Sequence, residues 1–156
     1  MIKLPVDDVL PELKRTLARS PNAVLVAPPG AGKTTRVPPA LLDEPWAQGG
    51  KLLVLEPRRL AARAAARRIA QERGESIGDT VGFRVRLQAA VGPRTRIEFL
   101  TEGLFARRIL ADPGLEGVAA VLFDEFHERS LDADLGMALA LDAQRHLRED
   151  LRLIAM

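Results

Sequence analysis

The sequence predicts an α/β domain in which a parallel sheet is flanked by helices on both faces. Short apolar runs typical of buried strands alternate with longer segments of helical periodicity, which is the pattern of β–α–β units. A glycine-rich segment at residues 27–35 follows the first run, and two carboxylates, Asp124 and Glu125, follow the run at residues 117–123. Because ligands bind at the carboxyl ends of parallel strands, we expect both features at one edge of one sheet.

Length and composition narrow the class of protein. With 156 residues, 47% of them hydrophobic, the chain is expected to form one domain with its own core. It has no cysteine, which excludes a disulfide framework and a thiolate metal site. The N-terminal segment lacks the apolar core of a signal peptide, and no apolar run reaches the ~18 residues of a membrane span. We therefore expect a cytoplasmic protein without membrane contact.

Charge is distributed unevenly along the chain, although the net charge is only +2. Residues 1–50 carry +1, residues 51–110 carry +7 and residues 111–156 carry −6. A basic middle segment is typical of a chain that binds a polyanion, and an acidic end is typical of a metal site or a solvated helix.

The first half of the chain predicts a helix at 7–19, a strand at 22–27, a helix from Lys33, a strand at 51–56 and a helix at 58–73. Asp7 or Asp8 can cap the first helix, whereas Pro38 and Pro39 should kink or shorten the second. The run at 51–56 is apolar enough to be central in a parallel sheet.

The second half predicts strands at 80–87, 95–100, 117–123 and 151–156, with helices at 103–111 and from Ser130 to about 147. Alternation of polar and apolar residues at 80–87 indicates a strand with one polar face. Ser130 is a typical N-cap, and two acidic residues, Asp132 and Asp134, suit the first turn of the helix that it would begin.

The segment at residues 27–35 has the composition of a phosphate-binding loop. Its glycines allow backbone N–H groups to converge on an anion, and the following helix presents its N-terminus to the same anion. Lys33 would contact the β- and γ-phosphates, and the Thr34 hydroxyl would ligate Mg²⁺. The full pattern calls for glycine at position 27, where this chain has Ala27. The residues expected to bind the nucleotide in this loop are Pro29, Gly30, Ala31, Gly32, Lys33, Thr34 and Thr35.

The acidic pair has a defined use beside such a loop. Asp124 would hold Mg²⁺, partly through water, and Glu125 would orient or deprotonate the water that attacks the γ-phosphorus. Acidic pairs are also common at strand-to-helix turns, so this interpretation depends on the phosphate loop. His127 has no second histidine or cysteine near it in the sequence, which argues against zinc.

Four segments, in order, resemble the motifs of the DEAH-box helicases of superfamily 2. Residues 27–35 are similar to motif I, residues 56–62 to motif Ia and residues 101–103 to motif Ib. Residues 124–130 resemble motif II, with Phe126 in place of the usual alanine. This form of motif II is most similar to that of a bacterial subgroup of the family.

The resemblance implies a RecA-like P-loop NTPase domain that hydrolyses ATP with Mg²⁺ in an RNA helicase. The implied catalytic residues are Lys33, Asp124, Glu125 and His127, the last coupling the ATP site to neighbouring motifs, with Thr34 and Asp124 as metal ligands. By the same resemblance, Arg58, Arg59 and Thr101 would contact the RNA backbone, and Arg68 would stack on the base of the nucleotide. The implied partners are ATP or ADP and single-stranded RNA. Backbone contacts carry no base information, so DNA is a second option for the strand.

In this family a Ser-Ala-Thr motif and a second RecA-like domain follow the position of Met156. The resemblance therefore implies that residues 1–156 form the first of two RecA-like domains, with the second as its partner. Alone, the chain is expected to bind nucleotide weakly and to hydrolyse it slowly or not at all. The alternative is a nucleotide-gated nucleic-acid-binding module without turnover, against which the presence of Glu125 argues.

Overall fold

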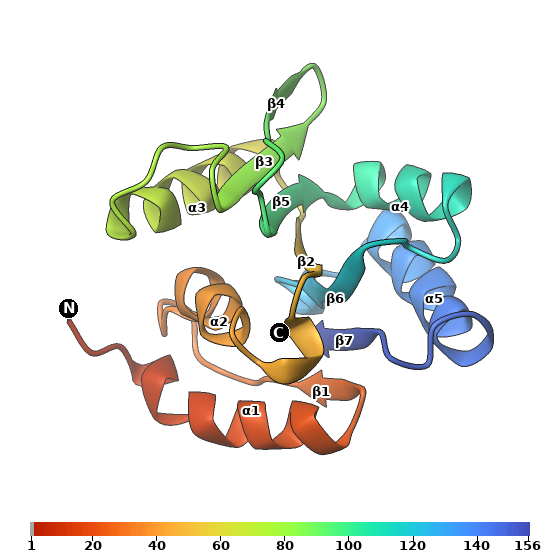
Figure 1. The fold of residues 1–156 in the computed structure, drawn as a ribbon, viewed down its shortest axis with the longest axis horizontal. Helices are drawn as coiled ribbons and strands as arrows, with labels where there is room; N and C mark the ends of the chain where they lie inside the picture. The colour runs from red at the N-terminus through yellow and green to blue at the C-terminus, as the bar shows by residue number, and fades with distance from the viewer. Residues whose placement is uncertain (1) are drawn as a thin grey trace.

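The computed structural model describes residues 2–156 and contains one seven-stranded sheet. The strands are β1 (Asn22–Val24), β2 (Lys51–Glu56), β3 (Val81–Val85), β4 (Gln88–Ala90), β5 (Ile97–Thr101), β6 (Val118–Phe123) and β7 (Arg152–Ala155). Their order across the sheet is β1-β7-β6-β2-β5-β3-β4 (Figure 1). Every neighbouring pair is parallel except the β3–β4 hairpin. The predicted parallel sheet is thus confirmed.

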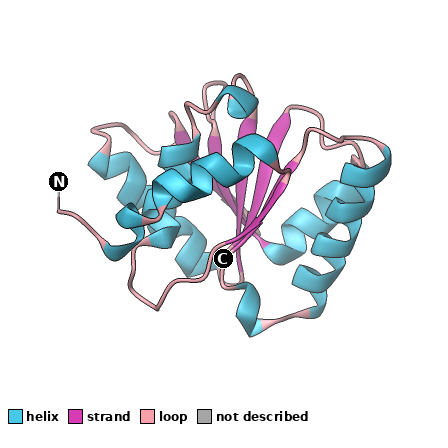
Figure 2. Ribbon diagram, turned by 90° about the horizontal axis from the view of Figure 1, so that it is seen from below, coloured by secondary structure: helices cyan, strands magenta, loops and turns pink. Residues whose placement is uncertain are grey.

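Helices cover both faces of this sheet (Figure 2). They are α1 (Leu10–Arg19), α2 (Lys33–Leu41), α3 (Arg59–Glu72), α4 (Glu102–Ala111) and α5 (Leu131–His146), with 3-10 turns η1 (Pro5–Asp8), η2 (Pro45–Ala47) and η3 (Phe126–Glu128). Residues of α1, α2 and α3 join one hydrophobic core, and residues of α4 and α5 join a second. None of the helices among the described residues is long and apolar enough to cross a membrane.

The central strand β2 divides its side chains between the two cores. Leu52 and Val54 belong to the core under α1–α3, whereas Leu53 and Leu55 belong to the core under α4 and α5. All four are fully buried, because a strand with helices on both faces has no solvent-facing side. This burial explains why the run at 51–56 lacks the alternation of an exposed strand.

The hairpin is the main departure from the predicted elements. The segment expected as one strand at 80–87 ends at Val85, and the chain reverses to form β4. Leu87 sits in the turn with φ +65°, a left-handed conformation that a leucine adopts rarely. No Gly or Asn occupies that turn, so the sequence carried no signal for it.

The ends of the first elements also differ from expectation. The segment expected to begin the first helix forms η1, in which the Asp7 carboxylate accepts a hydrogen bond from the Leu4 N–H, and α1 starts at Leu10. Pro11 is tolerated only in the first turn of a helix, so α1 cannot begin much earlier. β1 ends at Val24, three residues short of the prediction. The second helix, α2, starts at Lys33 as predicted and ends at Leu41, two residues after Pro39, with both prolines inside it.

Candidate nucleotide site

The loop between β1 and α2 has the backbone that anion binding requires. Gly30 and Gly32 have φ values of +78° and +93°, which favour glycine. A Cβ on Gly32 would lie 2.5 Å from Leu4 Cδ1. The loop is tied to η1, because the Ala31 carbonyl accepts a 3.1 Å hydrogen bond from the Val6 N–H. The loop is therefore fastened on one side and leaves its tip, including Pro29, exposed.

The Thr34 hydroxyl and Asp124 meet at the centre of the site. Thr34 Oγ1 donates a 2.6 Å hydrogen bond to Asp124 Oδ2, although the two residues are 90 positions apart. The side chain of Asp124 is buried, and its Oδ1 accepts a 2.9 Å hydrogen bond from the Glu125 N–H. A hydroxyl and a carboxylate are the oxygen donors that Mg²⁺ prefers, so the residues present fit this ion.

Glu125 turns the acidic segment toward the phosphate loop. Its backbone is left-handed, with φ +56° and ψ +33°, a conformation that costs on the order of 1 kcal/mol outside glycine. Glu125 Oε1 lies 3.7 Å from Lys33 Nζ, and Oε2 lies 3.4 Å from His127 Nε2. The carboxylate thus stands between the lysine of the loop and the histidine of the acidic segment.

A cavity of about 490 Å³ opens beside these groups. Its polar wall is formed by Lys33, Glu125 and His127. The remainder is apolar and comes from Val24, Leu25, Val26, Ala27, Pro29, Phe126, Ala155 and Met156. Ala27, the residue that departs from the loop pattern, therefore faces this cavity.

Glu56 is a member of the site that the sequence analysis did not assign. It ends β2, is 2% exposed, and lies in the core next to Asp124. Burial raises the pKa of Glu56 to about 10, and hydrogen bonding to Asp124 and repulsion from it act in the same direction. With its pKa raised in this way, Glu56 is protonated at neutral pH and is placed to donate a hydrogen bond to the Asp124 carboxylate. The sequence signal that could have pointed to Glu56 is an acidic residue at the end of an otherwise apolar strand.

The residues expected to contact RNA lie at the carboxyl ends of β2 and β5. Arg58 precedes α3 and binds Glu128 through two 2.9 Å hydrogen bonds. Arg59 is exposed in the first turn of α3, and Thr101 is the half-buried last residue of β5. β2 and β5 pair in parallel, with Glu56 opposite Thr101, so these residues are brought to the same edge of the sheet.

Arg68 and Thr35 lie apart from the cavity beside Glu125. Arg68 is exposed on α3, where its Nε donates a 2.7 Å hydrogen bond to Glu72 Oε1. Glu72 and Thr35 both line a separate groove of about 310 Å³ between α2 and α3. Thr35, the last residue of the segment at 27–35, therefore lines a different cavity from Lys33.

Known proteins are similar to this chain in sequence and in fold. Over all of its 156 residues the chain is 54% identical to the ATP-dependent RNA helicase HrpB of Escherichia coli. The crystal structure of E. coli DEAH/RHA helicase HrpB matches 98% of the chain with a TM-score of 0.93 and 55% identity. The chain belongs to the DEAH/RHA helicase family. ATP-dependent RNA helicase DHX33 of Drosophila melanogaster is a more distant member, 37% identical over 146 residues, which are 94% of this chain.

Membership of this family confirms the predicted DEAH-box resemblance and the RecA-like α/β fold. The chain spans only part of its relatives, 19% of E. coli HrpB and 21% of DHX33. No protein-family model matches the chain.

Proposed function

We propose that this chain is the ATP-binding and hydrolysis domain of an ATP-dependent RNA helicase, the first of its two RecA-like domains. The observation that carries the proposal is the 2.6 Å hydrogen bond from Thr34 to Asp124, which joins the phosphate loop to the acidic segment. A buried carboxylate paired with a loop hydroxyl suits a metal–phosphate site, and relatives that match nearly the whole chain are ATP-dependent RNA helicases.

Each side chain then has a role in phosphoryl transfer to water. The loop N–H groups and Lys33 would bind the phosphates, and Thr34 and Asp124 would hold Mg²⁺, which when bound would supply positive charge to the phosphate oxygens. Protonated Glu56 would donate a hydrogen bond to Asp124 and so orient this carboxylate. Glu125 orients the attacking water and accepts its proton, while His127, 3.4 Å from Glu125, links this step to neighbouring segments.

The remaining site residues would serve the base and the nucleic acid. Arg58, Arg59 and Thr101 would contact phosphates of a single strand, RNA being the strand named for the relatives. Arg68 would stack on the base, for which it must leave Glu72; the exposed pair costs little to break. In related NTPases an arginine finger contributes roughly 10³–10⁵ in rate, so we expect slow turnover without the second RecA-like domain.

Equilibrium binding of a fluorescent ADP analogue with Mg²⁺ tests this proposal. Lys33→Ala should lower the affinity at least tenfold, because the variant loses the cation next to the phosphates, whereas Lys14→Ala on α1 should leave it unchanged. A folded Lys33→Ala protein that binds as well as the unmodified chain would overturn the site. Glu125→Gln in a two-domain protein should keep binding and lose turnover, and unchanged turnover would contradict the role of Glu125.

A further inference from the structure

A second cavity, of about 500 Å³, lies on the sheet face that α4 and α5 cover, beside β5 and β3. Its apolar wall is formed by Leu100 and Leu104. Its other lining residues are charged: Lys51, Arg84, Glu98, Arg107 and Arg108. We call this cavity the basic groove. None of the residues of the nucleotide site lines it.

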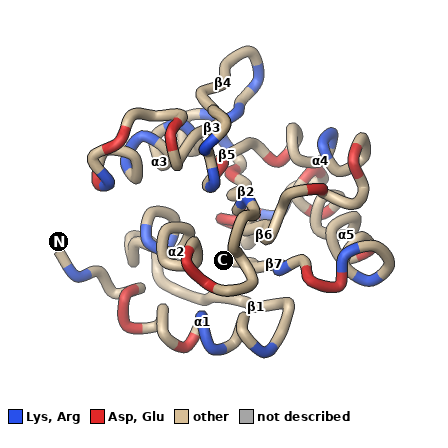
Figure 3. Tube along the Cα trace, in the orientation of Figure 1, with Lys and Arg blue, Asp and Glu red and all other residues tan. Residues whose placement is uncertain are grey.

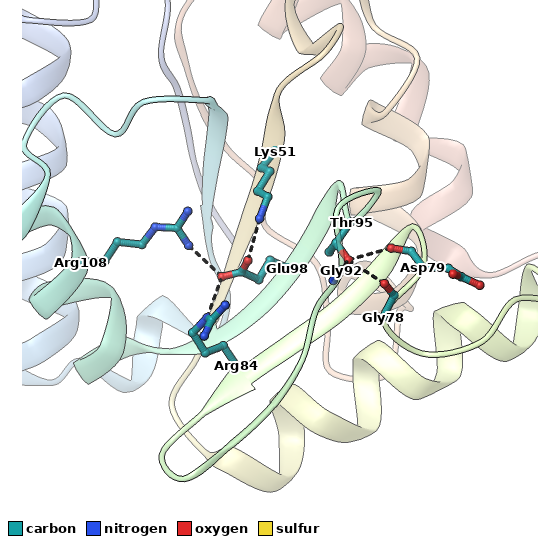
Figure 4. A network of polar contacts seen from close by, with 8 residues as sticks. All are labelled: Lys51, Gly78, Asp79, Arg84, Gly92, Thr95, Glu98 and Arg108. Atoms are coloured by element: carbon teal, nitrogen blue, oxygen red, sulfur yellow. Dashed lines mark hydrogen bonds and ion pairs between the residues drawn. The ribbon is translucent and has the colours of Figure 1, made fainter.

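Buried Glu98 organises the basic groove (Figure 4). Its side chain is 1% exposed, and its two oxygens accept hydrogen bonds from Lys51 Nζ at 3.1 Å and Arg108 Nη1 at 2.8 Å. Arg84 Nε lies farther away, at 3.8 Å. The two short contacts satisfy a carboxylate that would be costly to bury alone. Arg84 is therefore not required to compensate Glu98.

Positive charge in the groove exceeds what Glu98 can neutralise. Four cations line it against this one carboxylate, which leaves a formal charge of +3. The Arg84 side chain is 48% exposed, and Arg107 is exposed without an ion-pair partner among residues 2–156. Figure 3 shows Lys or Arg positions, in blue, on β3 and α4. Positive side chains gathered in one cavity produce a combined electric field that attracts an anion.

The basic groove continues into a third cavity of about 440 Å³ that reaches Thr101. The two cavities share Leu104 and Arg107, and the third is also lined by Arg86, Gly103 and one carboxylate, Asp132. Thr101 and Glu98 are three residues apart on β5, a distance of about 10 Å along a strand. Arginine side chains therefore line a continuous surface from Thr101, the expected nucleic-acid contact, to the amino end of β2.

We propose that Arg84 and Arg107 bind phosphates of a single-stranded nucleic acid whose path continues from Thr101 into the basic groove. The inference rests on the proposed function, because the strand must first bind at Thr101. Arginine forks match phosphate oxygens in two-point contacts. None of the described residues that line the groove is aromatic, so bases cannot stack there, and binding is insensitive to sequence and sensitive to salt. An acidic peptide offers carboxylates to the same arginines, but continuity with Thr101 favours the nucleic acid.

Fluorescence anisotropy with labelled oligouridylates of two lengths tests the groove. The variant is Arg84→Ala with Arg107→Ala, which keeps both short contacts of Glu98. Its matched control is Arg15→Ala with Arg19→Ala on α1. This control removes the same charge next to β1, the edge strand farthest from β3 and β4. The lengths are about 4 and about 12 nucleotides, the range of small single-strand sites.

The groove variant should bind the longer strand about tenfold more weakly and the shorter strand unchanged, and the α1 control should match the parent for both. Its slope of log affinity against log salt for the longer strand should fall by about 1.4, because two phosphate contacts are lost at about 0.7 each. If the variant and the parent bind the longer strand equally well, the proposal for the basic groove is wrong, whereas the assignments of Thr101 and of the nucleotide site still stand. The proposal is also wrong if the parent binds neither strand. It is wrong as well if the same arginines bind polyglutamate more tightly than the nucleic-acid strand.

Discussion

Arg58 and Glu128, 70 positions apart in the sequence, form a two-point ion pair with both N–O distances at 2.9 Å. The pair joins the segment after β2 to the acidic segment that carries Glu125. Arg58 lowers the pKa of Glu128, mainly by hydrogen bonding, so the carboxylate is ionised at neutral pH. Both side chains are partly exposed, and a pair of this kind is weak enough for a phosphate to replace its carboxylate.

Release of Arg58 should strengthen nucleic-acid binding. Glu128→Gln removes the competing carboxylate, and we expect a roughly threefold gain in affinity for a short oligouridylate, within the energy of one exposed ion pair. Anisotropy measures this gain. Asp134→Asn, which breaks the comparable pair with Arg129, should change nothing. If Glu128→Gln binds like the parent while Arg58→Ala binds more weakly, the carboxylate does not compete for Arg58.

The contact between Thr34 and Asp124 should make the effect of Mg²⁺ on nucleotide binding depend on both. Adding Mg²⁺ should increase the affinity of the parent for an ADP analogue. Thr34→Ala and Asp124→Asn should each reduce that increase about tenfold, the effect expected when a metal ligand or its partner is lost. The two effects should not add, because the residues touch. Titration with Mg²⁺ and with a chelator measures them.

Thr35 provides the contrast for this experiment. It lies on the side of α2 that faces the groove toward α3, away from Asp124. Thr35→Ala should therefore alter affinity equally with and without Mg²⁺. A selective loss of the Mg²⁺ effect in Thr35→Ala, or its full retention in Thr34→Ala, would contradict the assignment of the metal ligands.

Glu56 should make the free energy of unfolding depend on pH. Its pKa is about 10 in the folded chain and near 4.5 when unfolded, so folding takes up a proton between these values. The contribution is complete below pH 4.5 and declines as pH rises toward 10, by up to about 1.4 kcal/mol for each pH unit. Glu56→Gln keeps the hydrogen bond to Asp124 without the proton, so its stability relative to the parent should rise from pH 5 to pH 8. Thermal melts measure this rise, and parallel pH curves for the two proteins would argue against a protonated Glu56.

Ser130 should contribute to stability through two contacts. Its hydroxyl oxygen accepts a 3.0 Å hydrogen bond from the Ala133 N–H as the N-cap of α5 and donates a 2.9 Å hydrogen bond to Glu102. Ser130→Ala should cost about 1–2 kcal/mol, which includes a lost cap of about 1 kcal/mol. The expected fall in Tm is about 2–8 °C for a domain of this size. Ser130→Thr should recover most of it, and a Tm unchanged by Ser130→Ala would exclude the cap as a source of stability.

Features that depend only on residues close together in the sequence could be predicted from the sequence. The strand at 51–56 and the cap at Ser130 could be predicted, because side-chain period and capping are properties of neighbouring residues. The hairpin turn at Leu87 could not, because its left-handed residue is held by the pairing of β3 with β4 rather than by its own preference.

The order of motifs along the chain was enough to name the phosphate loop, the acidic pair and the helicase family, since each depends on residue types at fixed spacing. The fold alone decided which side chains meet: Thr34 with Asp124, Arg58 with Glu128, and Glu56 beside Asp124. These pairs come from segments that end or follow different strands, and the strand order of the folded sheet brings the carboxyl ends of those strands together. For the same reason the protonation of Glu56 and the cation excess around Glu98 became visible only in the folded chain, where desolvation and distance govern charge.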